Sequence, residues 1–213
     1  MRIVGIGGAV IKTAWEEIKE VARRGWIDVL IHNGGSLFHD FQRATDSTLK
    51  EIDTHSYPLH DLLEDYDVDK EASGLVWSWV KRKMKAPEGS LTRILEDQEK
   101  DVLMFTILGA DFWHLFSDDW TPLAVRMQRD IRWLCEMTKQ GPFHFVCMGS
   151  AVIMPEVFTK ALAVAKPKEF KADVVDFFDM YRPRTRVAKY GKYYQMEHRE
   201  FLTEILKRNF WSF

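Results

Sequence analysis

The stretch MRIVGIGGAVIKTAWEEIKEVARRGWIDVLIHNGG, residues 1–35, decides the fold. Two short β-rich runs, Arg2–Ile6 and Ile27–His32, each lead into a glycine turn, and an amphipathic segment separates them. Within that segment, Thr13-Ala-Trp-Glu16 is typical of a capping box and predicts a helix over residues 13–24. A strand, a glycine turn, a helix and a second strand form the unit from which parallel sheets are built.

The same alternation continues along the chain. We predict three further strands and four further helices; the strands cover residues 102–108, 143–148 and 173–178, and the helices cover residues up to 44, 121–140, 157–165 and 198–208. Between residues 46 and 100 the pattern weakens, which predicts a divergent helical insertion with a helix over 70–85. The 213 residues are therefore expected to form a single three-layer α/β domain with a mostly parallel, Rossmann-like sheet.

Composition excludes several classes of protein. The chain carries 30 Lys+Arg against 32 Asp+Glu, so no overall positive field points to nucleic acid. Cys135 and Cys147 are too far apart for a Cys-x-x-Cys motif, which indicates a reducing, cytoplasmic setting. No window approaches the roughly 18–20 apolar residues of a membrane helix.

Small or polar residues follow the predicted strands, and this places a candidate ligand site at their carboxyl ends. Such turns suit a nucleotide with a pyrophosphate group. The usual dinucleotide fingerprint is incomplete, because Val10 stands where the third glycine belongs and His32-Asn33 replace the ribose-binding acid. The candidate cofactor-binding residues are Gly7, Gly8, Asn33, Gly34, Gly35, Asp111, Gly149, Ser150 and Asp179.

Several polar side chains near these turns could carry chemistry. His39 and Asp40 could form an oriented acid–base pair, and His32, His39 and His114 could converge on a metal. No H-E-x-x-H spacing accompanies them, so a metal-dependent hydrolase is an alternative and no metal ligand is assigned. Arg182, in the basic run YRPRTR, could clamp a phosphate or carboxylate or belong to a solvated loop.

Five stretches of the sequence resemble the deoxyhypusine synthase-like family. Asp28–Asp40, DVLIHNGGSLFHD, resembles the family's D-V-L-V-T-T-A-G-G-V-E-E-D run without a gap, and Gly149–Ala165, GSAVIMPEVFTKALAVA, is the most specific match. Residues 7–13, 106–116 and 177–184 resemble three further motifs of the family, and the stretches occur in the family's order. The resemblance is closer still to bacterial deoxyhypusine synthase-like proteins of uncertain function, of which this chain would be a short, N-terminally trimmed member.

The resemblance implies a single NAD-binding domain, assembled as a homotetramer with active sites between subunits. The reference reaction of the family transfers an aminobutyl group from a polyamine to a lysine through NAD-dependent dehydrogenation and an imine on an enzyme lysine. The chain departs from this pattern. Met154 occupies the position of the imine lysine, and Phe38 and His39 occupy those of two acidic residues. We therefore expect no deoxyhypusine synthase activity.

The remaining residues suggest a related activity, the NAD-dependent oxidation and possible transfer of an amine- or alcohol-bearing small molecule. His39, with Asp40 behind it, is the expected general base, and Lys12 is expected either to bind a phosphate or to replace the imine lysine. The expected substrate-binding residues are His114, Glu156 and Arg182. The alternative within the same fold is a nucleotide-binding protein without catalysis.

Overall fold

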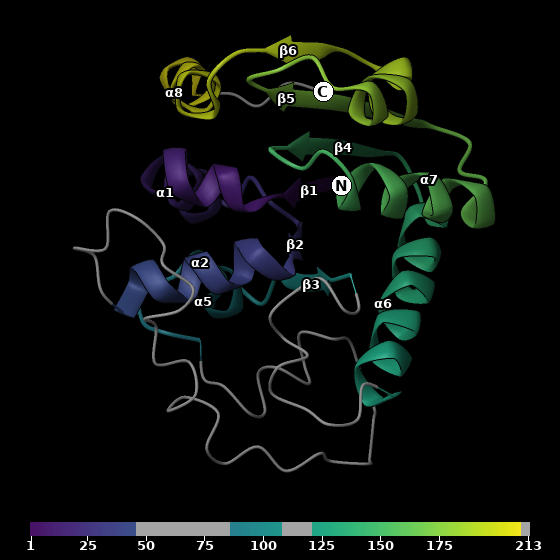
Figure 1. The fold of residues 1–213 in the computed structure, drawn as a ribbon, viewed down its shortest axis with the longest axis horizontal. Helices are drawn as coiled ribbons and strands as arrows, with labels where there is room; N and C mark the ends of the chain where they lie inside the picture. Colours follow the sequence, from purple (N-terminus) through teal and green to yellow (C-terminus); the bar gives the residue numbers. More distant parts are fainter. Residues whose placement is uncertain (46–85, 108–120, 210–213) are drawn as a thin grey trace.

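The computed structural model describes residues 1–45, 86–107 and 121–209. They build one six-stranded sheet in the order β3-β2-β1-β4-β5-β6, and every neighbouring pair is parallel (Figure 1). The strands are β1 (Arg2–Ile6), β2 (Val29–Asn33), β3 (Asp101–Phe105), β4 (Phe143–Met148), β5 (Phe170–Asp176) and β6 (Tyr193–Gln195). The predicted three-layer α/β fold is confirmed.

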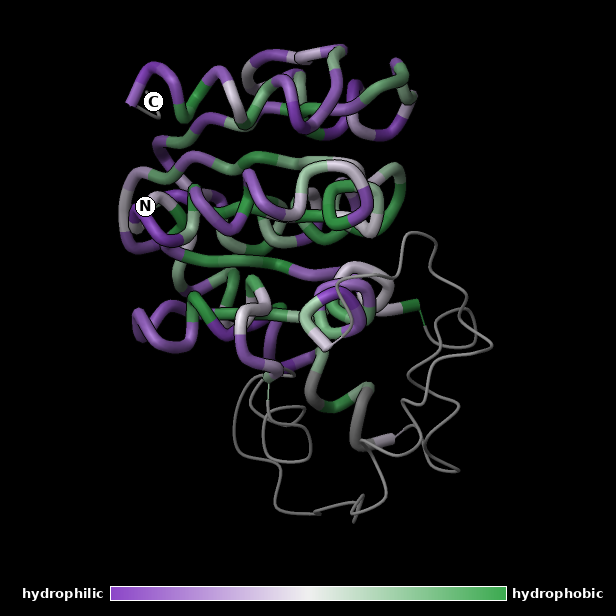
Figure 2. Tube along the Cα trace, turned by 90° about the vertical axis from the view of Figure 1, so that its left-hand side faces the viewer, coloured by the Kyte–Doolittle hydropathy of each residue, from purple (hydrophilic) through white to green (hydrophobic). Residues whose placement is uncertain are grey.

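Helices cover both faces of the sheet because each parallel crossover must return over one face. On one face lie α1 (Gly8–Arg23), α2 (Gly34–Thr45), α5 (Leu91–Asp97) and α8 (His198–Arg208), and on the other lie α6 (Thr121–Lys139), α7 (Ile153–Ala165), the π-helix η2 (Pro183–Val187) and the 3-10 helix η3 (Ala188–Tyr190) (Figure 1). Figure 2, viewed from the side of α1, α2 and α8, shows hydrophobic stretches along the strands and mixed polarity along the helices. In β1, Val4 packs toward the first set of helices and Ile3 toward the second, as strand alternation requires.

Helix α1 differs from its prediction. It begins at Gly8, five residues before the predicted start at Thr13, and it kinks at Ala14, whose backbone angles are φ −145° and ψ 34°. The Thr13 hydroxyl donates to the Ala9 carbonyl at 2.8 Å and therefore does not cap a helix start. Arg43 of α2 donates to the carbonyls of Ile11, at 2.5 Å, and Lys12, at 3.2 Å, next to the kink. The guanidinium thus satisfies backbone groups that the kink exposes.

Other boundaries shift by a few residues. The strands predicted over 27–32 and 173–178 occupy Val29–Asn33 and Phe170–Asp176, and the strand predicted over 102–108 ends at Phe105, with residue 108 outside the described residues. The basic run was predicted as a loop, which is wrong: Pro183–Val187 is helical, because Pro183 and Val187 are buried against the sheet. The three-residue strand β6 was not predicted.

The predicted insertion over residues 46–100 is described only in part. The helix predicted over 70–85 lies outside the described residues. Helix α5, by contrast, belongs to the main core, because Leu91 and Leu95 are fully buried in the cluster that α1 and the sheet form. Its N-cap is Ser90, whose hydroxyl accepts from the Arg93 amide at 3.0 Å.

Asp40 ties α5 to α1 and α2. One carboxylate oxygen accepts from the Trp15 indole and the Leu91 amide, both at 2.8 Å, and the other accepts from the Thr92 amide at 2.9 Å and the Thr92 hydroxyl at 2.7 Å. The side chain is fully buried, and burial raises its pKa while these four donors oppose that rise. The pairing of Asp40 with His39 is wrong, because consecutive residues of a helix do not face each other.

His32 belongs to the same buried network. Its Nδ1 lies 2.9 Å from the Ser36 hydroxyl and its Nε2 lies 3.3 Å from the Thr92 hydroxyl, and none of the imidazole reaches solvent. Burial lowers the pKa of His32 to about 3, so the ring is neutral. Both ring nitrogens are engaged, and the described residues hold no group of three or more metal-ligating side chains. A metal site that includes His32, as the hydrolase alternative requires, is therefore contradicted.

We expect Asp40→Asn to reduce the free energy of unfolding by about 2–4 kcal/mol, because one amide hydrogen pair would face the donors that the carboxylate now accepts. Urea denaturation measures the change. Asp97→Asn is the matched control, since the Asp97 carboxylate is mostly exposed and pairs only with Arg93 at 2.9 Å; it should cost less than about 0.5 kcal/mol. Equal effects of the two substitutions would contradict the structural role of Asp40.

His32 makes stability depend on pH. Its pKa of about 3 in the folded state lies below the ordinary 6.5, so the unfolded chain binds one more proton between these values. Stability is therefore complete above about pH 6.5 and is lost as the pH falls toward the folded-state pKa, with a slope of roughly 1.4 kcal/mol per pH unit. Urea titrations between about pH 4 and 6 measure the free energy of unfolding, and its pH dependence should be steeper in the wild type than in His32→Asn by this slope. Parallel curves would contradict it.

Candidate functional site

The strand order creates a topological switch point between β1 and β4. The chain leaves β1 through α1 toward β2 and leaves β4 through α7 toward β5, so the two connections diverge on opposite faces of the sheet. In open α/β sheets, ligands bind beyond the carboxyl ends of the strands at such a switch point. The turns that meet there carry Gly7 and Gly149, two of the predicted cofactor-binding residues.

The two turns lie against each other with no room for side chains. The Gly7 amide donates to the Met148 carbonyl at 2.9 Å, and a Cβ atom on Gly7 would overlap the Gly149 carbonyl. Gly149 itself has a φ of 60°, which lies in the left-handed region that favours glycine. Packing within the chain thus requires glycine at both positions, and their contact holds the two turns together at the switch point.

The start of α1 lies at this switch point. Gly7 is the N-cap residue, it offers no side chain to cap the helix, and the first turn contains no acidic residue. The first amide groups of a helix lack intrahelical partners and carry partial positive charge. An anion such as a pyrophosphate therefore fits this end of α1. Gly8 lets His39 approach, because a Cβ atom there would lie 2.9 Å from the imidazole Cδ2.

The start of α2, in contrast, is capped by the protein. The Asn33 side-chain oxygen accepts from the Ser36 amide at 2.7 Å. A Cβ atom added to Gly35 would lie 3.7 Å from the Asn33 side-chain oxygen, an ordinary van der Waals contact, so packing within the chain does not require glycine at this position. Of the three residues predicted here to bind the cofactor, Asn33 thus has a structural role, whereas the cofactor roles of Gly34 and Gly35 stay predictions.

His39 and Lys12 meet beside the open end of α1. Burial lowers the pKa of His39 to about 4, and the nearby Lys12 ammonium adds to this effect, while Gln42 partly offsets it. The imidazole is therefore neutral at physiological pH and has a basic nitrogen free to take up a proton. Lys12 is exposed, as a cation that contacts a phosphate would be. The structure brings these two predicted residues together, without Asp40.

His198 lies at the same edge of the sheet and was not predicted as a site residue. It is fully buried, its Nδ1 lies 3.3 Å from the Thr13 hydroxyl, and its ring packs 4.3 Å from the Phe177 ring. A Cβ atom on Gly149 would come within 3.0 Å of this imidazole. Burial lowers its pKa to about 4. Only its position at the start of the last predicted helix could have indicated it.

The turn after β4 positions α7. The Ser150 hydroxyl is buried and accepts from the Met154 amide at 3.2 Å, so it satisfies one of the first amides of this helix, whose N-cap residue is Val152. Met154 is buried in the core, where its sulfur would lie 2.8 Å from a Cβ atom added to Gly5. The position that corresponds to the family's imine lysine is thus a core position in this chain.

Glu156, in the first turn of α7, is surrounded by cations. Its carboxylate lies 2.8 Å from Lys160, 2.9 Å from Arg186 and 3.4 Å from Arg182. The hydrogen bond from Lys160 and the charges of Arg186 and Arg182 lower the pKa of Glu156, so it is ionised. The predicted substrate residues Glu156 and Arg182 are thus neighbours, but an ion-paired Glu156 is not free to bind an amine.

Two predicted residues, Asp111 and His114, lie outside the described residues. Asp179 pairs with Arg184 on an exposed segment, and its contact with a cofactor stays a prediction.

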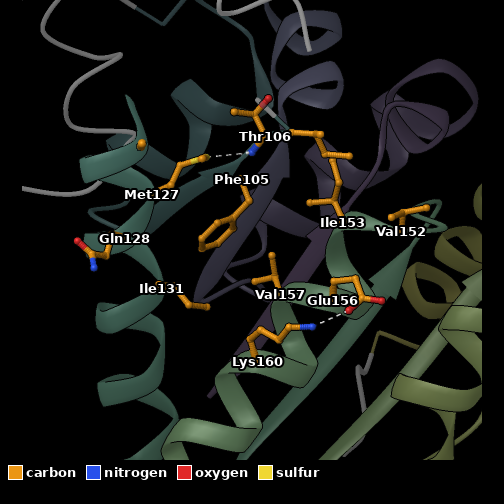
Figure 3. A pocket seen from close by; sticks show the side chains of 12 residues that line it. Phe105, Thr106, Met127, Gln128, Ile131, Val152, Ile153, Glu156, Val157 and Lys160 are labelled. Atoms are coloured by element: carbon orange, nitrogen blue, oxygen red, sulfur yellow. Dashed lines mark hydrogen bonds and ion pairs between the residues drawn. The ribbon is translucent and has the colours of Figure 1, made fainter. Parts of the chain in front are cut away.

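An apolar cavity of about 460 Å³ lies beside Glu156, at the carboxyl end of β3 (Figure 3). Its walls come from the end of β3 and from α6 and α7, and Glu156 and Lys160 stand on the α7 side. Apolar side chains make up most of the lining, which includes Phe105, Ile107, Met127, Ile131, Val152, Ile153 and Val157.

Among the described residues, no helix is long and apolar enough to cross a membrane. Neither a protein-family model nor a curated protein sequence matches the chain.

Solved structures resemble the chain across nearly its whole length. ArgZ, a cyanobacterial arginine dihydrolase of the ornithine–ammonia cycle, is 16% identical with a TM-score of 0.66, over 97% of this chain and 29% of its own. AgrE, in a ternary complex with ornithine and NAD+, is 11% identical with a TM-score of 0.67, over 97% of this chain and 30% of its own. A candidate deoxyhypusine synthase from Entamoeba histolytica is 9% identical with a TM-score of 0.63, over 98% of this chain and 74% of its own.

This chain thus spans less than a third of the ArgZ and AgrE chains. At these identities the likeness shows a shared fold, which confirms the deoxyhypusine synthase-like architecture expected from the sequence. Membership of that family stays a prediction.

Proposed function

We propose that the chain binds NAD at the switch point between β1 and β4 and uses it to oxidise a small amine or alcohol. The observation that carries this proposal is the open, uncapped start of α1 at the switch point of the 3-2-1-4-5-6 sheet. The fit rests on groups of this chain: first-turn amides without a side-chain cap, a turn without Cβ atoms and the Lys12 cation nearby. The structure of AgrE with ornithine and NAD+ supports the same cofactor.

Different residues would bind the cofactor and accept the proton. The amides after Gly7 and the Lys12 ammonium would hold the pyrophosphate, and the turn at Gly149 would border the other half of the dinucleotide. NAD supplies a hydride acceptor when it is bound. The neutral His39 imidazole would take the proton that the substrate's amine or hydroxyl group loses during oxidation.

A second candidate is a nucleotide-binding protein without catalysis. Two features that catalysis was expected to need are absent. The position of the imine lysine holds Met154, which lies in the core, and the Asp40 carboxylate accepts four hydrogen bonds and therefore cannot assist a base. Both candidates predict nucleotide binding, and they differ in turnover.

NAD+ binding is tested by calorimetric titration of the wild type and of Ala9→Glu. A carboxylate in the first turn of α1 stabilises the helix but repels a pyrophosphate, so affinity should fall at least about tenfold without loss of stability. Ala163→Glu, on an exposed position of α7, is the matched control and should bind normally. Absence of wild-type binding at about 5 mM NAD+ would overturn the proposal for both candidates.

The role of His39 is tested by following NADH formation with L-ornithine and spermidine as trial substrates. His39→Gln should lower kcat by about 10²–10⁴-fold and leave NAD+ affinity within about threefold of the wild type. For the wild type, the low pKa of His39 predicts a kcat/KM that falls only as the pH approaches about 4. Undiminished turnover in His39→Gln would exclude His39 as the base, and NAD+ binding without wild-type turnover of either compound would favour the second candidate.

A further inference from the structure

The charges around the cavity point to a ligand of the opposite sign from the amine expected from the sequence. Lys160, Arg182 and Arg186 converge on the single carboxylate of Glu156, so the group carries more positive than negative charge. Within the described residues, the charged groups that shift the pKa of Glu156 are all cations: Lys160, Arg186 and Arg182. A cationic head group would meet repulsion here, whereas guanidinium groups bind carboxylates well.

The cavity beside this cluster selects the rest of the ligand. Its volume of about 460 Å³ lies within the range of small-molecule sites, and its walls are mostly apolar. Ile107 and Val152, which line it, keep 45% and 39% of their surface exposed. Large apolar side chains that are open to solvent next to a concave surface mark binding sites, because covering them removes apolar area from water.

The two features share residues. Glu156 and Lys160 line the cavity and also belong to the charged cluster, and in Figure 3 their ion pair stands at the edge of the apolar walls. Arg186 reaches the same carboxylate from η2, the helix that the sequence did not predict. A molecule in the cavity would thus have its apolar part against α6 and α7 and one end beside the cations.

We propose that this cavity binds a small amphipathic carboxylate, whose apolar body fills the space between α6 and α7 and whose carboxylate contacts Arg186 and Arg182. The binding requires no nucleotide, so it is independent of the proposed function. Glu156 and Lys160 line the cavity, whereas Arg182 and Arg186 lie outside its lining and reach the Glu156 carboxylate at the cavity edge, where they can hold the head group by charge and hydrogen bonding.

The test compares three probes with the same chain length in calorimetric titrations without NAD+: octanoate, octanol and octylamine. Octanoate should bind about tenfold or more tightly than octylamine, and octanol should lie between them. Octylamine binding as tightly as octanoate would overturn the proposal, as would the absence of octanoate binding at about 5 mM.

Variants locate the head group and the body. Arg186→Gln should weaken octanoate about five- to tenfold and leave octanol unchanged, whereas Arg208→Gln, which removes a similar exposed Arg–Glu pair on α8, should change neither. Ala124→Trp should fill the cavity and weaken octanoate and octanol alike, with Ala163→Trp as its exposed control on α7. Unchanged octanoate affinity in Arg186→Gln would place the head group elsewhere.

Glu156→Gln separates the anion site from an amine site. Removing the only carboxylate of the cluster frees the three cations, so octanoate should bind about three- to tenfold more tightly. Thermal unfolding of each variant verifies that it is folded. Weaker octanoate binding in this variant, or octylamine binding that depends on Glu156, would contradict the proposal.

Discussion

The close approach of Gly7 and Gly149 is the contact on which the rest of the site depends. The turn after β1 and the turn after β4 touch through backbone atoms, and a single methyl group on Gly7 would overlap the Gly149 carbonyl. This contact lets the two strands pair in register from Arg2 to Ile6 while their connections diverge to opposite faces of the sheet. The switch point, the uncapped start of α1 and the placement of α7 all follow from it.

Much of the fold could be predicted from residues 1–35, because a strand that is apolar on both faces and ends in glycine has few partners other than a helix and a parallel neighbour. The positions of β1, β4 and α8 agree with the sequence pattern. The start of α1 could not be predicted, since Thr13 and Glu16 have the spacing of a cap but lie at an internal kink. The strand β6 and the helix over Pro183–Val187 depend on tertiary burial, which local pattern does not encode.

The candidate site could be predicted in its location but less well in its chemistry. Sequence adjacency suggested that Asp40 orients His39, whereas helix geometry turns Asp40 inward to bind Trp15, Leu91 and Thr92. The sequence around Glu156 suggested that its carboxylate could bind an amine. One of the cations that pair with this carboxylate is Arg186, which is distant in sequence and could not be foreseen. His198 reached the site only through packing of the last helix against α1. Charges and caps at a site depend on such distant partners.

The uncapped start of α1 would be the anion-binding part of a dinucleotide site. A crystal structure of the protein grown with NAD+ would locate the cofactor. We expect pyrophosphate oxygens within hydrogen-bond distance, about 3 Å, of the backbone amides of Gly8 and Ala9. A dinucleotide bound elsewhere, with these amides in contact only with water, would contradict it.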